Sequence, residues 1–186
     1  MCECAWARCN KHRAFIFGIL SDMKSLKVPY FTQDTDYTCG PTSLQMVLEY
    51  YGVQHSEPDL AKQMKTSCET GTCPIQMSKT AVKLGFHSYV NTDASFEEIR
   101  FLLSLNISPI IRFVETNDNE DHYGVVISAT KDNIIINDPW NGPELEFLKA
   151  EFIDRWTSNK IENCHRWLMA VSPGPLPLGR QFSPHE

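Results

Sequence analysis

Residues 33–52 read QDTDYTCGPTSLQMVLEYYG, a polar loop followed by a run with helical periodicity. Pro41 suits a first helical turn, because the N–H that proline lacks would have no partner there. The apolar residues after it recur at helical spacing and form one stripe: Leu44, Val47, Leu48 and Tyr51. Gly52 is a natural helix stop. The stretch therefore predicts a core-facing helix whose first turn carries Cys39.

The position of Cys39 at this helix start has two interpretations. Unpaired backbone N–H groups and the helix dipole favour negative charge at a helix N-terminus, so they would lower the pKa of the thiol and make it a nucleophile near neutral pH. Free cysteine is also one of the most frequently buried residue types, and a small apolar residue would open a core helix equally well. The stretch by itself leaves both interpretations open.

The length and composition are those of a single globular domain. The chain has 186 residues, of which 42% are apolar and 22% charged. A net charge of −6 gives no support to nucleic-acid binding. The longest apolar run, residues 14–20, is too short to span a bilayer. We therefore expect a soluble, cytoplasmic protein without a membrane segment.

The cysteines do not form the dense, even-numbered framework of a small disulfide-rich domain, because there are seven of them. A reducing compartment is the simpler expectation, and it predicts free thiols at Cys68 and Cys73. Four residues near the N-terminus offer soft metal ligands in a spacing that matches no zinc module: Cys2, Cys4, Cys9 and His12. We therefore expect no metal and no organic cofactor.

Three parts of the chain differ in character. Residues 1–22 look like a disordered extension, or like an artefact of start-site choice, since Met23 is a plausible start of its own. Residues 23–172 carry the periodic patterns of a folded domain. Residues 173–186 are rich in proline and glycine, and this composition predicts a disordered tail.

Helical patterns dominate the first half of the domain and strand patterns the second. Capping boxes at Ser56 and Ser95 predict two short helices, and Pro74 predicts the start of another. The second half reads as strands with one short helix: strand 109–114, hairpin strands 122–129 and 133–138, helix 151–156 and strand 166–171. The fold class that follows is α+β, with a helical N-terminal half packed on an antiparallel sheet.

Two ionisable residues stand at the same end of the predicted hairpin. His122 begins one strand and Asp138 ends the next, so a carboxylate there can hold an imidazole and support its charged form. If the start of the Cys39 helix packs against that end, a thiol, a base and an orienting acid come together. That combination activates a cysteine nucleophile and favours the functional interpretation of Cys39.

These residues also carry a resemblance to a known family. The run VPYFTQ ending at Gln33, the CGPTSL run from Cys39, HYGVV from His122 and NDP around Asp138 resemble the C39-like branch of the papain-like cysteine peptidases, over roughly residues 28–171. The resemblance implies a papain-like fold and attack by Cys39 on a carbonyl carbon. It implies that His122 is base and then acid, and that Asp138 orients His122.

The resemblance also implies an oxyanion hole and a peptide or protein substrate. The side-chain amide of Gln33 and the backbone N–H of Cys39 would bind the oxyanion. Three aromatic residues close to these positions in the sequence are candidates for substrate binding, with core packing as the alternative for each: Tyr37, Tyr123 and Trp140.

The sequence leaves the finer function open. The best-known members of the family cut after a double glycine and are fused to membrane exporters with an ATPase, whereas this chain shows no transmembrane segment and no Walker motif. The same residues would also support acyl transfer to an amine. A catalytically silent peptide-binding module is the third reading, although a pure binder has no chemical need for all four site residues. The cleavage motif and the oligomeric state are not determined by the sequence.

Overall fold

The computed structural model describes residues 25–157 and 165–184 of the chain. Its helices and strands are, in chain order, α1 (Cys39–Tyr50), α2 (Glu57–Met64), α3 (Pro74–Lys83), β1 (His87–Asn91), α4 (Phe96–Ser104), β2 (Ile110–Val114), β3 (Asp121–Ala129), β4 (Asn133–Asp138), β5 (Gly142–Leu148), α5 (Lys149–Arg155) and β6 (Leu168–Ser172). The helix predicted from the opening stretch thus begins at Cys39, as expected.

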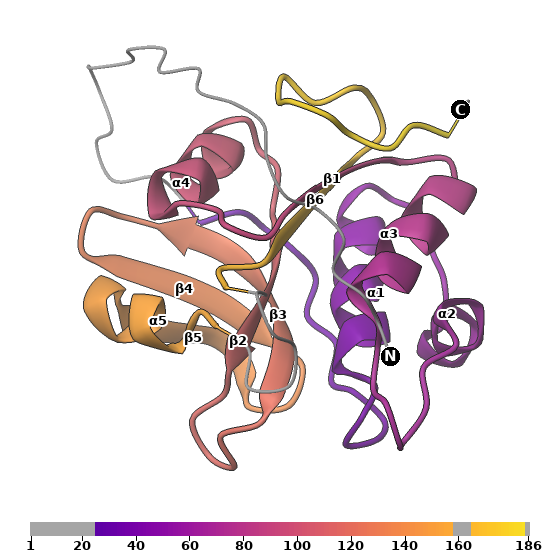
Figure 1. Ribbon diagram of the computed structural model, residues 1–186, viewed down its shortest axis with the longest axis horizontal. Helices are drawn as coiled ribbons and strands as arrows, with labels where there is room; N and C mark the ends of the chain where they lie inside the picture. The colour runs from indigo at the N-terminus through magenta and orange to yellow at the C-terminus, as the bar shows by residue number, and fades with distance from the viewer. Residues whose placement is uncertain (1–24, 158–164, 185–186) are drawn as a thin grey trace.

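The strands form one antiparallel sheet in the order β1-β6-β2-β3-β4-β5. Figure 1 shows α1, α2 and α3 on one side of this sheet and α4 and α5 on the other. The predicted α+β class, with early helices packed on an antiparallel sheet, is confirmed. The two central strands, β2 and β3, are buried along almost their whole length because helices cover both faces.

Each face of the sheet has its own hydrophobic core. The core under α1, α2 and α3 includes helix residues Leu44, Leu48, Leu60 and Met77 and sheet residues Val125 and Met169. The core under α4 and α5 includes Ile99, Leu102 and Phe152 together with sheet residues Val126 and Ile136. Neighbouring residues on β3 enter opposite cores, because side chains alternate between the faces of a strand.

Most of the helices and strands predicted from local sequence patterns are present in the structure. The side chain of Ser56 accepts a hydrogen bond from the Asp59 N–H, and that of Ser95 accepts one from the Glu98 N–H, so both predicted capping arrangements are present. The hairpin is the pair β3 and β4. Two strands were missed, β1 and β5. Both lie at the edges of the sheet, where pairing with β6 or β4 decides the structure of a weakly patterned segment.

The described part of the proline-rich tail packs against the sheet. Phe182 exchanges two backbone hydrogen bonds with Ser88 in β1, at 2.8 and 2.9 Å, and Leu176 is buried. The side-chain amide of Gln181 closes the intervening turn by bonding the backbone of Leu176 in both directions. This arrangement differs from the disorder that the composition of residues 173–186 predicted. The predictions for residues 1–22 lie outside the described residues.

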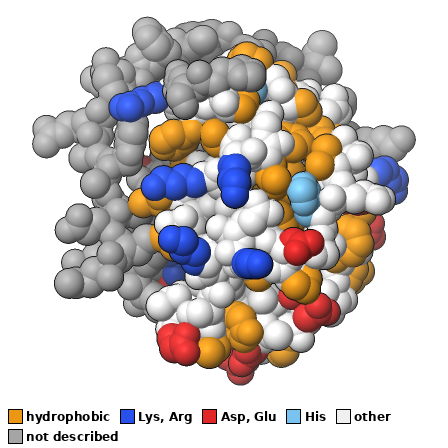
Figure 2. All heavy atoms as spheres, turned by 90° about the vertical axis from the view of Figure 1, so that its right-hand side faces the viewer, with side chains coloured by type: hydrophobic (Ala, Val, Ile, Leu, Met, Phe, Trp, Pro, Cys, Tyr) orange, Lys and Arg blue, Asp and Glu red, His pale blue; other side chains and the backbone are white. Residues whose placement is uncertain are grey.

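The surface over α2 and α3 faces the viewer in Figure 2, where lysine and arginine side chains gather in the middle and acidic side chains towards the lower edge. The exposed lysines of these helices are Lys62, Lys79 and Lys83, and the exposed Lys65 directly follows α2. Across residues 25–157 and 165–184, none of the helices combines the length and the apolar character that crossing a membrane requires.

Candidate active site

The thiol of Cys39 lies at the N-terminus of α1, where it is only 7% exposed. No side chain caps this end of the helix, because the hydroxyl of Thr38 bonds Thr35 instead. The backbone N–H of Gly40 is therefore left to the sulfur, and it lowers the pKa of the Cys39 thiol. This is the helix-terminus environment that the sequence suggested for a thiolate.

A loop before α3 closes over the same helix start. A Cβ added at Gly40 would lie 2.6 Å from the side chain of Thr72, which is closer than real side chains approach. The backbone carbonyl of Thr72 accepts a hydrogen bond from the Tyr123 hydroxyl at 3.0 Å. Gly40 is thus required by a close approach, and the loop is fixed between α1 and β3.

The hairpin places His122 beside Asp138, as its predicted geometry implied. Val125 pairs with Asn137 across β3 and β4, so the start of one strand and the end of the other share an end of the hairpin. His122 Nε2 and Asp138 Oδ1 are 2.7 Å apart, and both side chains are buried. The ring of Phe113 packs edge-on against the imidazole at 5.8 Å. The imidazole is therefore held in one orientation.

Asp138 is fixed in turn by the residues that follow it. Its Oδ1 also accepts from the backbone N–H groups of Trp140, at 2.8 Å, and Asn141, at 3.0 Å. The side-chain amide of Asn141 donates to Oδ2 at 3.0 Å. Sequence reasoning did not single out Asn141. An aspartate whose side chain bonds the backbone two and three residues later is the ordinary Asx-turn pattern, and Asp138-Pro-Trp-Asn141 carried that signal.

The interaction between Cys39 and His122 is electrostatic, because each favours the charged form of the other. Because Nε2 of His122 bonds Asp138, the ring atom that remains for the thiol is Nδ1. Burial acts to raise the pKa of Cys39. The charge of His122 and the N–H groups of Tyr123 and Gly40 outweigh burial, and the pKa of the thiol is lowered below 9.0.

The other two groups shift in the matching directions. Burial acts to lower the pKa of His122, but the Cys39 thiolate and Asp138 raise it to about 10. Burial acts to raise the pKa of Asp138, and the hydrogen bonds from His122 and Asn141 lower it instead. The three shifts describe a thiolate–imidazolium pair backed by a carboxylate, which is the charged form that attacks a carbonyl carbon.

The amide of Gln33 is buried on the loop that leads into α1. Its Nε2 donates to the Thr35 carbonyl at 2.6 Å, which leaves its second N–H available. Its backbone N–H donates to the Pro139 carbonyl at 3.0 Å, and this bond ties the loop to the turn after Asp138. Within the described part of the chain, the Oε1 of Gln33 has no hydrogen-bond partner.

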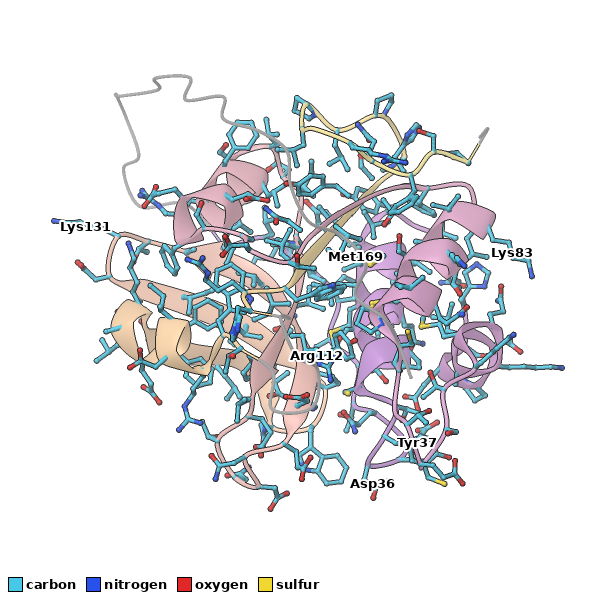
Figure 3. All side chains as sticks on the ribbon, in the orientation of Figure 1. Asp36, Tyr37, Lys83, Arg112, Lys131 and Met169 are labelled. Carbon is cyan, nitrogen blue, oxygen red and sulfur yellow. The ribbon has the colours of Figure 1, made fainter. Side chains whose placement is uncertain are left out.

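The strand that carries His122 is clamped at its first residue. Arg112 of β2 donates from Nη2 to Asp121 Oδ2 at 2.7 Å, and its guanidinium lies 5.7 Å from the centre of the Tyr123 ring. Figure 3 shows Arg112 between the sheet and the helices, above the loop that carries Asp36 and Tyr37. Sequence reasoning missed this pair, because nothing local links two residues on different strands.

The three aromatic candidates for substrate binding occupy different environments. Tyr123 is buried in the core, where its ring packs edge-on against Trp167 at 5.5 Å, so its side chain packs the core rather than lining an open cleft. Tyr37 is partly exposed on the loop before α1. Trp140 is 49% exposed, two residues after Asp138. Tyr37 and Trp140 are placed where a substrate could reach them.

Two of the remaining cysteines are described. Cys68 is an exposed free thiol, as expected. Cys73 is disulfide-bonded, so the expectation of a free thiol at this position is wrong. Among the described residues, no three His, Cys, Asp or Glu side chains are grouped as metal ligands. The weak metal-ligand pattern of the N-terminal extension lies outside those residues.

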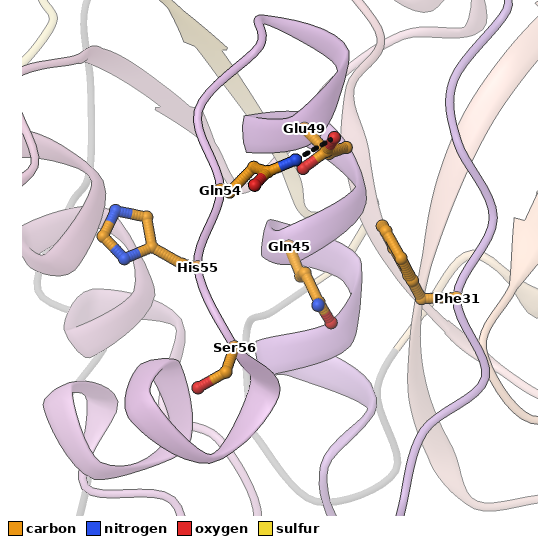
Figure 4. A pocket seen from close by; sticks show the side chains of 6 residues that line it. All are labelled: Phe31, Gln45, Glu49, Gln54, His55 and Ser56. Atoms are coloured by element: carbon orange, nitrogen blue, oxygen red, sulfur yellow. Dashed lines mark hydrogen bonds between the residues drawn. The ribbon is translucent and has the colours of Figure 1, made fainter.

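A hollow of about 430 Å³ opens on the flank of α1 (Figure 4). The side-chain amide of Gln54 donates to Glu49 across it at 3.2 Å. Its lining is formed by Phe31, Gln45, Glu49, Gln54, His55 and Ser56. Cys39, His122 and Asp138 do not line this hollow.

Comparisons with known proteins agree with the geometry. A model of the peptidase C39 family matches residues 27–163. The LcnC-like lactococcin transport/processing ATP-binding protein of Lactococcus lactis is 32% identical over 137 residues, which are 73% of this chain and 18% of that protein. The transport/processing ATP-binding protein ComA of Streptococcus pneumoniae is 32% identical over 161 residues, 86% of this chain and 21% of that protein. The chain thus spans about a fifth of these relatives.

Solved structures show the same fold. The peptidase domain of Streptococcus ComA has a TM-score of 0.64 at 23% identity, covering 77% of this chain and 97% of that domain. A double glycine motif protease from an AMS/PCAT transporter, solved in complex with the leader peptide, also has a TM-score of 0.64 at 23% identity. The match covers 81% of this chain and 94% of that chain. A structure described as a C39-like peptidase from Bacillus anthracis has a TM-score of 0.65 at 18% identity, and the match covers 82% of this chain and 98% of that chain. The papain-like fold expected from the sequence is confirmed.

Proposed function

Because the chain belongs to the peptidase C39 family, we propose that it is a cysteine peptidase that hydrolyses a peptide bond through a thioacyl-enzyme intermediate. One observation carries the proposal. The buried His122 lies 2.7 Å from Asp138, and its charge lowers the pKa of the Cys39 thiol while the thiolate raises the pKa of His122. Together these contacts make a nucleophile, a base and an orienting acid.

The reaction follows from the charged form of this pair. The Cys39 thiolate attacks the carbonyl carbon of the scissile bond, and the N–H of Cys39 and the amide of Gln33 donate to the oxyanion that forms. The His122 imidazolium gives its proton to the leaving amine as the carbon–nitrogen bond breaks. Water then attacks the thioester, and His122 takes the proton of that water. The thiolate departs and the acid product leaves.

Asp138 has an orienting role in this scheme. Its carboxylate fixes the tautomer of His122 and stabilises the imidazolium, while Trp140 and Asn141 hold the carboxylate itself. A buried carboxylate that accepts this many hydrogen bonds stays ionised. The base is therefore aligned before any substrate arrives.

The substrate class we propose is a peptide that carries small residues at the cleavage site. The support is one structural relative, described as a double glycine motif protease and solved with a leader peptide. Transport and ATP binding, which the names of the longer relatives include, are not transferred to this chain.

Peptide cleavage tests the proposal directly. Two matched peptides, one with Gly-Gly and one with Ala-Ala at the same position, are incubated with wild type and with Cys39→Ala, and the fragments are weighed by mass spectrometry. We expect wild type to cut the Gly-Gly peptide after the second glycine, and Cys39→Ala to cut neither. Equal fragments from both proteins would refute Cys39 as the nucleophile.

The same assay separates hydrolysis from the alternatives. In ¹⁸O-labelled water containing a primary amine, hydrolysis places the label in the new carboxylate, whereas acyl transfer gives an amide. We expect the labelled acid. An amide product would make the chain an acyl transferase. Binding of the peptide without any Cys39-dependent product would make it a silent binding module.

A further inference from the structure

Glu57 is a buried carboxylate that joins two parts of the active site. It is the first residue of α2 and is only 6% exposed, although its neighbours Pro58 and Asp59 are exposed. Both of its oxygens accept the backbone N–H of Asp34 at 3.1 Å. Its Oε2 also lies 2.6 Å from the hydroxyl of Thr42, which donates to it. The Glu57 side chain, which belongs to α2, thus bonds both the loop before α1 and α1 itself.

The two bonded positions stand beside the two donors of the proposed oxyanion hole. Asp34 directly follows Gln33, whose amide is one donor. Thr42 lies three residues after Cys39, whose backbone N–H is the other, and it is therefore on the same side of the first turn of α1. The Glu57 carboxylate fixes the separation between the loop carrying Gln33 and the helix turn carrying Cys39.

We propose that Glu57 is a positioning residue for the oxyanion hole, holding the Gln33 loop and the start of α1 at the separation that the oxyanion needs. The inference rests on the proposed peptidase function and deepens it. Glu57 itself does not touch the reacting atoms. Its effect is geometric, because oxyanion donors act only when they lie within about 2.7–3.1 Å of the developing charge.

The hydrogen bonding around Glu57 argues against a purely structural role. Burying a carboxylate is costly, and a residue kept for stability alone could be apolar. The hydroxyl of Thr42 does not depend on Glu57 for a partner, because the Thr38 carbonyl lies 2.9 Å away. What only Glu57 supplies is the link between Asp34 and Thr42.

Kinetics of three variants test the proposal. Glu57→Ala removes the link, and we expect kcat to fall about 10²-fold with KM changed less than about twofold, since a misplacement of 1 Å costs that much. Glu57→Gln keeps one carbonyl oxygen for the Asp34 N–H, and its kcat should lie between Glu57→Ala and wild type. Ser78→Ala is the matched control, because it removes a buried hydrogen bond, Ser78 to Ser88 at 2.9 Å, away from the site.

Alkylation by iodoacetamide separates positioning from damage to the thiol. Alkylation needs the thiolate of Cys39 but no oxyanion hole, so its rate and pH profile should match wild type in Glu57→Ala. A kcat for Glu57→Ala equal to that of Ser78→Ala would overturn the proposal. So would a loss of alkylation that parallels the loss of turnover.

Amide hydrogen exchange keeps this test independent of peptidase activity. In Glu57→Ala, exchange at residues 34–38 should accelerate relative to Ser78→Ala, while exchange in β3 stays as in wild type. If wild type cuts no peptide and the exchange result holds, the proposed function fails and the positioning of the loop stands. If wild type is active and exchange at residues 34–38 is unchanged, the positioning inference fails alone.

Discussion

At the scale of single residues, Cys39 and His122 each change the proton affinity of the other. The charged thiolate–imidazolium pair exists between the lowered pKa of Cys39 and the raised pKa of His122, which is about 10. Below the lower limit the thiol is protonated and does not attack. Above the upper limit His122 has lost the proton that the leaving amine needs. The activity should therefore follow a bell-shaped pH profile.

Alkylation against pH measures the lower limit. The iodoacetamide rate of wild type, minus that of Cys39→Ala, isolates Cys39 from the exposed Cys68. We expect the difference to reach half its maximum below pH 9.0, because His122 and the helix N–H groups stabilise the thiolate. A midpoint at the value of an ordinary thiol would contradict the ion pair.

Peptide turnover against pH measures the upper limit. We expect kcat/KM to decline as the pH approaches 10, where His122 loses its proton. In Asp138→Ala the decline should begin at lower pH, since the carboxylate that raises the pKa of His122 is gone. If kcat/KM declined over the same pH range in wild type and in Asp138→Ala, the role of Asp138 in raising the pKa of His122 would be refuted.

Gln33→Ala tests the oxyanion hole at the same scale. The loss of one donor should lower kcat on the order of 10²-fold with little change in KM, because the oxyanion exists only in the transition state and intermediate. Gln54→Ala is the control, since its amide bonds Glu49 away from the site. Equal rates for the two variants would mean that Gln33 is misassigned.

At the scale of elements, the site is a meeting point of the α1 N-terminus and the β3–β4 hairpin. The loop before α3 closes this junction: Gly40 allows Thr72 to approach α1, and the Thr72 carbonyl bonds Tyr123 of β3. Arg112 and Asp121 secure the start of β3 beside His122. The site geometry therefore depends on packing between elements, not on any one of them.

Gly40→Ala probes that packing. The new methyl would lie 2.6 Å from Thr72, so α1 or the loop has to move, and we expect a loss of about 1–3 kcal/mol in the free energy of unfolding. In a Thr72→Gly background the three clashing atoms are gone and the same change should cost much less. Denaturant unfolding of the four proteins gives the coupling between the two positions. If the changes in unfolding free energy from Gly40→Ala and Thr72→Gly were additive, the close contact between Gly40 and the Thr72 side chain would be disproved.

At the scale of the whole molecule, one sheet carries a core on each face, and the chain after β6 returns to cover its edge. Phe182 pairs with Ser88 of the edge strand β1, and Leu176 joins the core that includes α4. An uncovered edge strand is prone to pair with other chains. The segment therefore protects that edge of the sheet.

Leu176→Ala measures how firmly the segment is packed. Leu176 is 4% exposed, and its truncation should lower the free energy of unfolding by about 2–3 kcal/mol. Leu148→Ala is the control, because Leu148 is 63% exposed and its truncation should change stability by less than about 0.5 kcal/mol. Equal, small effects would mean that residues 173–184 are disordered, as their composition predicted.

Particular residues show where sequence reasoning succeeded. The caps at Ser56 and Ser95 are local, each bonding an N–H three residues later, and both were foreseen. The hairpin that brings His122 to Asp138 follows from two adjacent strands and a short turn. Strand β1 was missed because its partner, β6, lies about eighty residues further along the chain, and no local sequence pattern predicts that pairing.

The sequence by itself determined the elements that carry the proposed site: a helix starting at Cys39, a hairpin ending at His122 and Asp138, and Gln33 on the loop before the helix. Only the tertiary structure decided that Tyr123 packs the core and that Glu57 bridges Asp34 and Thr42, at separations of 23 and 15 residues. The physical reason is the distance along the chain over which each kind of interaction acts. Periodicity, capping and turn chemistry act over a few neighbouring residues, whereas burial and distances between elements depend on how the whole chain packs.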